Sequence, residues 1–195
     1  MKLSQPYFQT FIPLRQYMSD DILLIENIPV EDTFPEGGLI SIWMLNRPDK
    51  LNSLNSDSHK SLKEACEMAE SNDLIRVIVI SGAPPNSPLE GRKSKPFSFA
   101  AGADISEFVG KNSDDVRPFF EDNAWERVWN LSKPTIAMID GFALGGGSEL
   151  ALSCDIRIAS DRSNLGTPVI NLGLMPGGGG TQRLSRLSGY GKALE

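Results

Sequence analysis

The residues best suited to chemistry lie in the stretch 141–155, where three consecutive glycines are followed by Ser148 and Glu149. The glycines follow an apolar run, and residues without a Cβ let the backbone turn and approach a ligand closely. Residues 148–152 favour a helix, so we expect a helix N-terminus to face that turn. Its unpaired N–H groups and positive dipole end favour an oxygen that carries negative charge. The pattern therefore predicts an oxyanion hole with the Glu149 carboxylate beside it as an acid or base.

This stretch alone has an equally good structural interpretation, in which the glycines only connect a strand to a helix. Glu149 would then complement the helix dipole at the surface. Two further stretches favour the chemical interpretation. Residues 99–105 form a small-residue turn after a short apolar strand, and this turn can supply a second backbone donor. Residues 168–184 combine an apolar segment, four consecutive glycines and the sequence Thr-Gln-Arg-Leu.

Together these stretches resemble the enoyl-CoA hydratase/isomerase, or crotonase, superfamily. The resemblance runs from about residue 22 to the last residue, and its motifs are specific in combination. They are Asn-Arg-Pro at 46–48, Lys-Leu-Asn at 50–52, Ala-Ala-Gly-Ala-Asp at 100–104, Gly-Gly-Gly-Ser-Glu-Leu at 145–150 and Pro-Gly-Gly-Gly-Gly-Thr-Gln-Arg-Leu at 176–184. The resemblance implies an α/β fold, a spiral of ββα repeats. It also implies an acyl-CoA thioester as substrate, with no cofactor beyond the coenzyme A moiety and no metal.

The resemblance also assigns roles by position. The amides of Ala103 and Gly146 would bind the thioester oxygen, and Glu149 falls on the first of the two catalytic glutamates of family hydratases. The second falls on Val169, which cannot carry a proton, although a carboxylate such as Glu107 could substitute. The expected substrate-binding residues are Lys50, Leu51, Ala101, Asp104, Ile105, Gly145, Pro168, Val169 and Gly177.

Two functions of different classes follow. The first is an enzyme that hydrates or moves a double bond of an acyl-CoA, with Glu149 as its acid/base. The second is a catalytically weak acyl-CoA binder or assembly subunit that keeps the oxyanion turn and lacks half of the acid/base pair. A nucleotide-binding fold fits poorly, because no Gly-x-Gly-x-x-Gly opens a helix and residues 173–181 lack the lysine of a P-loop.

The composition is that of one soluble globular domain: 195 residues, of which 40% are hydrophobic and 23% charged. A net charge of −6 argues against a nucleic-acid binder. The coenzyme A phosphates would therefore need local cations such as Lys50, Arg47 or the cluster at 92–95, which a solvated loop explains equally well. The two cysteines, Cys66 and Cys154, fit packed thiols in a reducing compartment. No apolar run reaches the roughly 20 residues of a membrane span. We therefore expect an intracellular protein of the cytosol or an organelle matrix, mitochondrial or peroxisomal.

Periodicity predicts the elements that position these residues. We expect a mobile extension over 1–20, which faintly resembles a transit peptide, and a core domain over 21–195. The expected strands are 22–28, 38–45, 75–81, 135–140 and 154–160. A hairpin loop is expected over 29–38 and a long loop over 83–96. Helices are expected up to residue 71, with Asn55 or Ser56 as the N-cap, and over 113–132. Pro118 should lie close to the start of the regular part of the second helix.

Two sets of side chains on these helices have open roles. His59, the only histidine, is expected to pack or to lie at a rim rather than to act as a base. Phe119, Trp125 and Trp129 form an apolar stripe for which core packing is favoured over an acyl-chain wall or a subunit contact.

The chain stops where members of the resembled family continue through several helices, which close the acyl pocket and build a trimer. The resemblance therefore predicts a core that lacks this C-terminal region and exposes apolar surface. It also implies a homo-oligomer, a trimer or a dimer of trimers.

Overall fold

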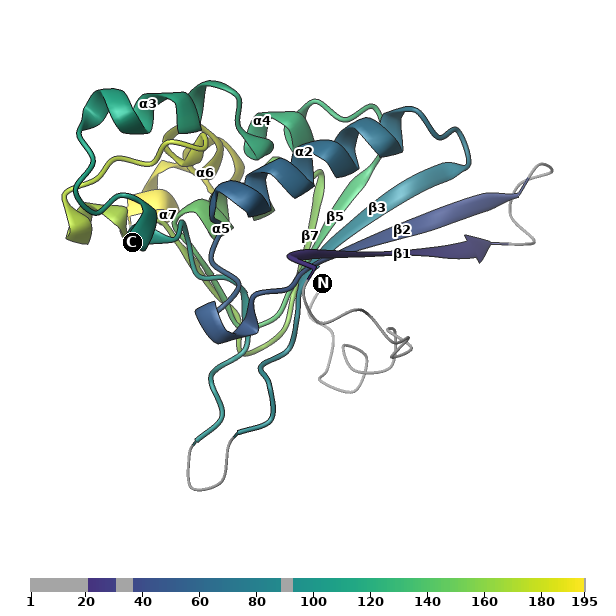
Figure 1. Cartoon of the computed structure of the whole chain (residues 1–195), viewed down its shortest axis with the longest axis horizontal. Helices are drawn as coiled ribbons and strands as arrows, with labels where there is room; N and C mark the ends of the chain where they lie inside the picture. Colours follow the sequence, from purple (N-terminus) through teal and green to yellow (C-terminus); the bar gives the residue numbers. More distant parts are fainter. Residues whose placement is uncertain (1–20, 31–36, 89–92, 195) are drawn as a thin grey trace.

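The computed structural model describes residues 21–30, 37–88 and 93–194, which form an α/β fold on two sheets (Figure 1). The larger sheet has the strand order β1-β2-β3-β5-β7. Its first pair is an antiparallel hairpin, and the other neighbouring strands are parallel. These strands are β1 (Leu23–Val30), β2 (Gly38–Leu45), β3 (Ile75–Gly82), β5 (Thr135–Ile139) and β7 (Ile156–Ala159).

The smaller sheet contains three short parallel strands in the order β4-β6-β8. Each of them follows a strand of the larger sheet along the chain, so β3 leads to β4, β5 to β6 and β7 to β8. The chain passes from the larger sheet to the smaller one and then into helices at each of these turns, which confirms the expected spiral of ββα repeats. The bounds are β4 (Ser98–Ala100), β6 (Phe142–Leu144) and β8 (Asn164–Gly166).

Helices cover the sheets and join the repeats. Figure 1 shows α2 lying along the larger sheet, while the later helices gather beyond one end of it. The α-helices are α2 (Ser56–Glu70), α3 (Ser113–Glu121), α4 (Ala124–Trp129), α5 (Gly146–Ser153), α6 (Gly180–Ser188) and α7 (Tyr190–Leu194). Short 3-10 helices lie in the connections of the described part: η1 (Pro48–Lys50), η2 (Ile105–Glu107) and η3 (Pro168–Leu172).

Several predicted boundaries need correction. β1 continues through Pro29, which was expected in the loop, because an edge strand tolerates a residue that cannot donate to a ladder. The expected strand over 154–160 begins only at Ile156, since α5 extends to Ser153. The predicted N-cap of α2 is confirmed, because the Asn55 side chain accepts a hydrogen bond from the Ser58 amide at 2.9 Å.

The helix predicted over 113–132 is two helices, so that prediction was wrong. Asp122 leaves the helical conformation, and the Asn123 side chain caps α4 by accepting from the Glu126 amide at 2.9 Å. Pro118 lies inside α3 rather than near its start, because Asn112 and Asp115 form a capping box at its beginning. The break turns α4 so that Trp125 is buried in the core.

The core lies between the larger sheet, the smaller sheet and helices α2, α4 and α5, and its largest members are Trp43, Trp125 and Phe99. Both cysteines are free and buried there, as expected, and burial raises the pKa of each thiol to about 12. Within the described ranges, no helix is long and apolar enough to cross a membrane. The extension expected over 1–20 lies outside the described residues.

Candidate active site

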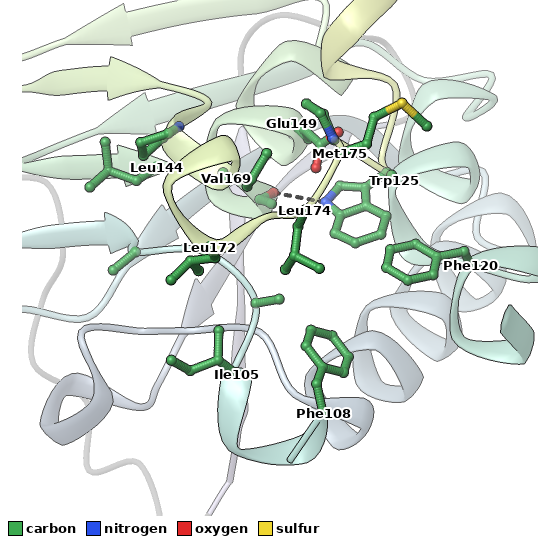
Figure 2. Close-up of a pocket in the computed structure, with 18 residues that line it drawn as sticks. Ile105, Phe108, Phe120, Trp125, Leu144, Glu149, Val169, Leu172, Leu174 and Met175 are labelled. Atoms are coloured by element: carbon green, nitrogen blue, oxygen red, sulfur yellow. Dashed lines mark hydrogen bonds between the residues drawn. The ribbon is translucent and has the colours of Figure 1, made fainter. Parts of the chain in front are cut away.

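A cavity of about 150 Å³ lies where the smaller sheet, α5 and the loop before α6 meet. Its lining consists of backbone turns, apolar side chains and the carboxylate of Glu149. In the view of Figure 2, Leu144, Val169 and Leu172 lie on the left, and Trp125, Phe120 and Phe108 lie on the right. The cavity therefore presents one acidic group to an otherwise apolar space.

Two small-residue turns form part of this wall. The Gly102 carbonyl accepts from the Leu54 amide at 2.8 Å, and the Asp104 amide donates to the Leu54 carbonyl at 2.8 Å. These bonds use the residues on either side of Ala103, so the Ala103 amide faces the opposite side, away from Leu54. Within the described part of the chain, the Ala103 amide donates to no protein acceptor.

The second turn leads from β6 into α5. Gly145 has φ +49°, a conformation that glycine adopts without strain, and Gly146 is the first residue of α5. An amide in that position has no acceptor within its own helix. A Cβ on Gly146 would lie 3.5 Å from the Ala103 nitrogen, so the two turns are direct neighbours.

Trp125 fixes this second turn from the other side. Its indole nitrogen donates to the Gly146 carbonyl at 2.8 Å, shown as the dashed line in Figure 2. The Phe120 ring stacks on the Trp125 ring with 6.1 Å between the ring centres, and the His59 ring packs edge-on with 4.5 Å between the centres. Trp125 is thus a core residue, the role favoured for the apolar stripe, and it also lines the cavity.

Glu149 lies one helical turn into α5 and is only 2% exposed. Its Oε1 accepts from the Gly178 amide at 2.7 Å and from the Gly180 amide at 2.9 Å. Burial raises the pKa of Glu149 above its ordinary value, while these two hydrogen bonds and the charge of Arg183 act in the opposite direction. A carboxyl group with a raised pKa holds its proton to a higher pH than a free carboxyl group does, and it can also release that proton.

The raised pKa makes a prediction about stability that needs no substrate. The folded state binds the Glu149 proton more tightly than the unfolded state, so this contribution is complete below about pH 4.3 and is lost as the pH rises through the folded pKa. Glu149→Gln cannot ionise, and its amide oxygen can still accept from the two loop amides. We expect the free energy of unfolding of Glu149→Gln, relative to that of the parent, to increase as the pH rises from 4 to 8. Urea unfolding at a series of pH values measures this difference. A difference that stays constant with pH would contradict the assigned burial effect.

Most of the residues expected from the sequence meet at this cavity. Its lining includes Ala101, Ala103, Ile105, Gly145, Gly146, Glu149, Pro168, Val169 and Gly177. Lys50, Leu51 and Asp104 lie outside it. Lys50 is exposed at the end of η1, so contact with a part of the substrate that projects from the cavity stays a prediction.

Leu51 and Asp104 support the turn at 101–104 from behind. The Leu51 carbonyl accepts from the Ala101 amide at 3.0 Å. Asp104 accepts from Ser106 at 2.6 Å and forms an ion pair with Arg47 at 2.7 Å, and these hydrogen bonds lower its pKa to about 2. Arg47, one of the cations considered for a phosphate, is therefore already paired with a carboxylate.

Two other candidates have structural roles. His59 is buried as expected: its Nδ1 accepts from the Ala124 amide at 3.3 Å, and burial, with a smaller effect of Lys63, lowers its pKa to about 4. Glu107 accepts from the amide and hydroxyl of Ser56 and does not line the cavity. Of the basic cluster, Lys95 donates to the Asp49 carbonyl, and Arg92 lies outside the described residues. No group of potential metal ligands occurs within the described residues.

Sequence reasoning did not assign to the site several residues that line the cavity. Trp125 and Phe120 follow the helical pattern of core residues, so periodicity alone could not separate packing from lining. The others belong to short elements, such as Leu144 in β6 and Leu172 in η3, or to irregular segments, and neither is long enough to show a period. The unassigned lining residues are Gly102, Phe108, Phe120, Trp125, Leu144, Leu172, Leu174, Met175 and Pro176.

Comparisons with known proteins point to one family. Residues 36–195 match the family model described as enoyl-CoA hydratase/isomerase. The short-chain-enoyl-CoA hydratase of Clostridium acetobutylicum is 44% identical over 160 residues, which are 81% of this chain and 57% of that protein. The mitochondrial methylglutaconyl-CoA hydratase of Mus musculus is 37% identical over 185 residues, 94% of this chain and 55% of that protein.

Solved structures show the same similarity in three dimensions. The enoyl-CoA hydratase from Bacillus anthracis has a TM-score of 0.73 and 35% identity, with 89% of this chain and 60% of that chain covered. The enoyl-CoA hydratase from Thermoplasma volcanium has a TM-score of 0.72 and 32% identity, with coverage of 92% and 64%. This chain thus spans little more than half the length of the curated relatives named above.

Proposed function

This chain belongs to the enoyl-CoA hydratase/isomerase family, and on that premise we propose that it processes an acyl-CoA thioester by hydration or by moving a double bond. In this proposal the amides of Ala103 and Gly146 bind the thioester oxygen, and Glu149 transfers the proton. One observation carries it: two adjacent turns and a buried carboxylate line the same apolar cavity. Each well-placed oxyanion donor contributes about 10²- to 10³-fold, and a positioned acid or base about 10²- to 10⁴-fold.

The lining also supports an apolar acyl group. Apart from Glu149, the cavity side chains are aliphatic, aromatic or methionine, and within the described residues none of them is cationic. A second carboxylate on the acyl chain would have no partner there and would lose its hydration. We therefore propose an uncharged acyl chain, and no cofactor beyond the coenzyme A moiety.

A catalytically weak acyl-CoA binder or assembly subunit is the alternative, and Val169 favours it. Val169 lies in η3, and its Cγ1 would be 3.1 Å from a Cβ on Gly145. The position that resemblance assigns to the second carboxylate is therefore apolar, and it is part-buried in the cavity lining. Turnover of crotonyl-CoA, measured beside its binding, separates the two functions.

The oxygen contact can be tested without turnover. We expect butyryl-CoA to bind at least about tenfold more tightly than its thioether analogue, because the thioether lacks the oxygen that would accept from Ala103 and Gly146. Isothermal titration calorimetry of both compounds measures the difference. Equal affinities would contradict an oxyanion hole formed by these two turns, whether or not the chain is catalytic.

A homo-oligomer also stays a proposal. Large apolar side chains remain exposed near the cavity and in the last helices, which supports coverage by other polypeptide. They include Val109 and Met175, each 80% exposed, Ile170 at 75% and Tyr190 at 76%. A location in the cytosol or an organelle matrix is likewise proposed, on the two free, buried cysteines.

A further inference from the structure

The four glycines of residues 177–180 each pack against a different side chain. A Cβ on Gly177 would lie 2.5 Å from Phe120, and one on Gly178 would lie 2.5 Å from Trp125. On Gly179 it would lie 2.3 Å from Arg183, and on Gly180 it would lie 3.1 Å from Glu149. The loop therefore fits closely among three cavity residues and Arg183. Of these four side chains, Arg183 has no part in the proposed chemistry and does not line the cavity.

Arg183 lies on α6, one turn after this loop. Its Nη1 donates to the Gly178 carbonyl at 2.6 Å, and its guanidinium lies over the Trp129 ring at 4.5 Å from the ring centre. Gly178 is also one of the two residues whose amides bind Glu149. The same peptide segment thus receives the arginine on its carbonyl and the carboxylate on its amide.

Taking the proposed function as given, we propose that Arg183 is a positioning residue for Glu149: it fixes the 177–180 loop, whose two amides orient the carboxylate. The guanidinium reaches Gly179 closely only because that residue has no side chain, and the stack on Trp129 holds the arginine in place. A planar group with several fixed donors suits this task better than the single ammonium of a lysine.

The charge of Arg183 acts on Glu149 as well. It lowers the pKa of Glu149 and so opposes the larger effect of burial. Among the described residues, Glu126 of α4 is the other acidic group whose charge acts on Arg183, and the neutral His59 of α2 lies against Trp125. Removal of the arginine charge should therefore move the ionisation of Glu149 to higher pH.

Arg183→Gln removes the charge and the stack, Arg183→Lys keeps only the charge, and Arg186→Gln is the matched control. Arg186 lies on the same helix, is exposed and makes the same change in net charge. We expect Arg183→Gln to lower kcat for crotonyl-CoA about tenfold or more with little change in KM, and to shift the pH profile of kcat upward. Arg183→Lys should keep the position of the pH profile but not the full kcat, and Arg186→Gln should leave both unchanged.

A readout that needs no turnover separates this proposal from the function on which it rests. The pH dependence of stability, compared with and without Glu149→Gln, reports the ionisation of Glu149. Arg183→Gln should extend that dependence to higher pH, and Arg186→Gln should not. If the parent has no turnover but this shift appears, the proposed function fails and the role of Arg183 stands. If Arg183→Gln shifts neither the stability profile nor the kcat profile, or if Arg186→Gln shifts them equally, the role of Arg183 is overturned. Arg183→Lys supplies the comparison should Arg183→Gln not fold.

Discussion

Glu149→Gln should reduce the hydration of crotonyl-CoA by about 10²-fold or more while acyl-CoA binding changes little. The substitution keeps the size of the side chain and an oxygen that can accept from Gly178 and Gly180, the two bonds that hold Glu149 at 2.7 and 2.9 Å. What it removes is the ionisable group. Steady-state rates and calorimetric binding of butyryl-CoA, on the same preparations, measure the two quantities.

Glu107→Gln is the control for this change. Glu107 is the nearby carboxylate that could substitute for a missing acid, yet it accepts from Ser56 and lies outside the cavity lining. We expect its replacement to leave hydration within about threefold of the parent, because it would lose no group from the reacting centre. Undiminished turnover in Glu149→Gln would contradict the assignment of the acid/base, and a loss only in Glu107→Gln would move the role there.

Each of the two turns could be predicted because its determinants are local, whereas their meeting is expected only from the resemblance to the family. Consecutive small residues after an apolar strand indicate a close turn wherever they occur, and Glu149 follows its turn by one helical step. The partners of Glu149 could not be predicted in this way. The amide of Gly180 is 31 residues away along the chain, and only the packing of α6 against α5 brings it to the carboxylate.

The break between α3 and α4 shows a different limit. Apolar residues keep the helical period across residues 122–123, so the pattern predicts one helix. An asparagine at position 123 could equally be an exposed residue inside one long helix or the N-cap of a second helix. Only the backbone conformation shows that Asn123 is the N-cap of α4. The break also matters for the site, because α4 places Trp125 against the turn at Gly146.

The glycines of the 145–147 run likewise differ in ways that the sequence hides. Gly145 supplies a positive φ, while Gly147 is needed for distance alone. At Gly147, α5 crosses β4 so closely that a Cβ would lie 1.9 Å from the Ala100 carbonyl oxygen and 2.7 Å from its carbon. Two backbones meet there, so no flexible side chain can move aside.

Gly147→Ala should therefore lower the free energy of unfolding by about 3 kcal/mol or more. This is a large share of the roughly 5–15 kcal/mol by which a folded domain is typically stable. The sign of this stability change is informative, because alanine inside a helix is otherwise about 1 kcal/mol more favourable than glycine. A gain would be expected if α5 could simply move away from β4. The free energy of unfolding in urea, followed by circular dichroism, measures the change.

Gly166→Ala is the matched control for the same substitution. Gly166 lies in β8 without a positive φ, and a Cβ there would meet no atom within 4 Å. We expect a change of less than about 1 kcal/mol, of either sign. The comparison also reaches the site, because β4 leads into the turn at Ala103 and α5 begins at Gly146. Separation of these two elements in Gly147→Ala should abolish butyryl-CoA binding together with the stability. A Gly147→Ala protein as stable as the Gly166→Ala protein would show that the close crossing of α5 and β4 is not what holds the two turns together.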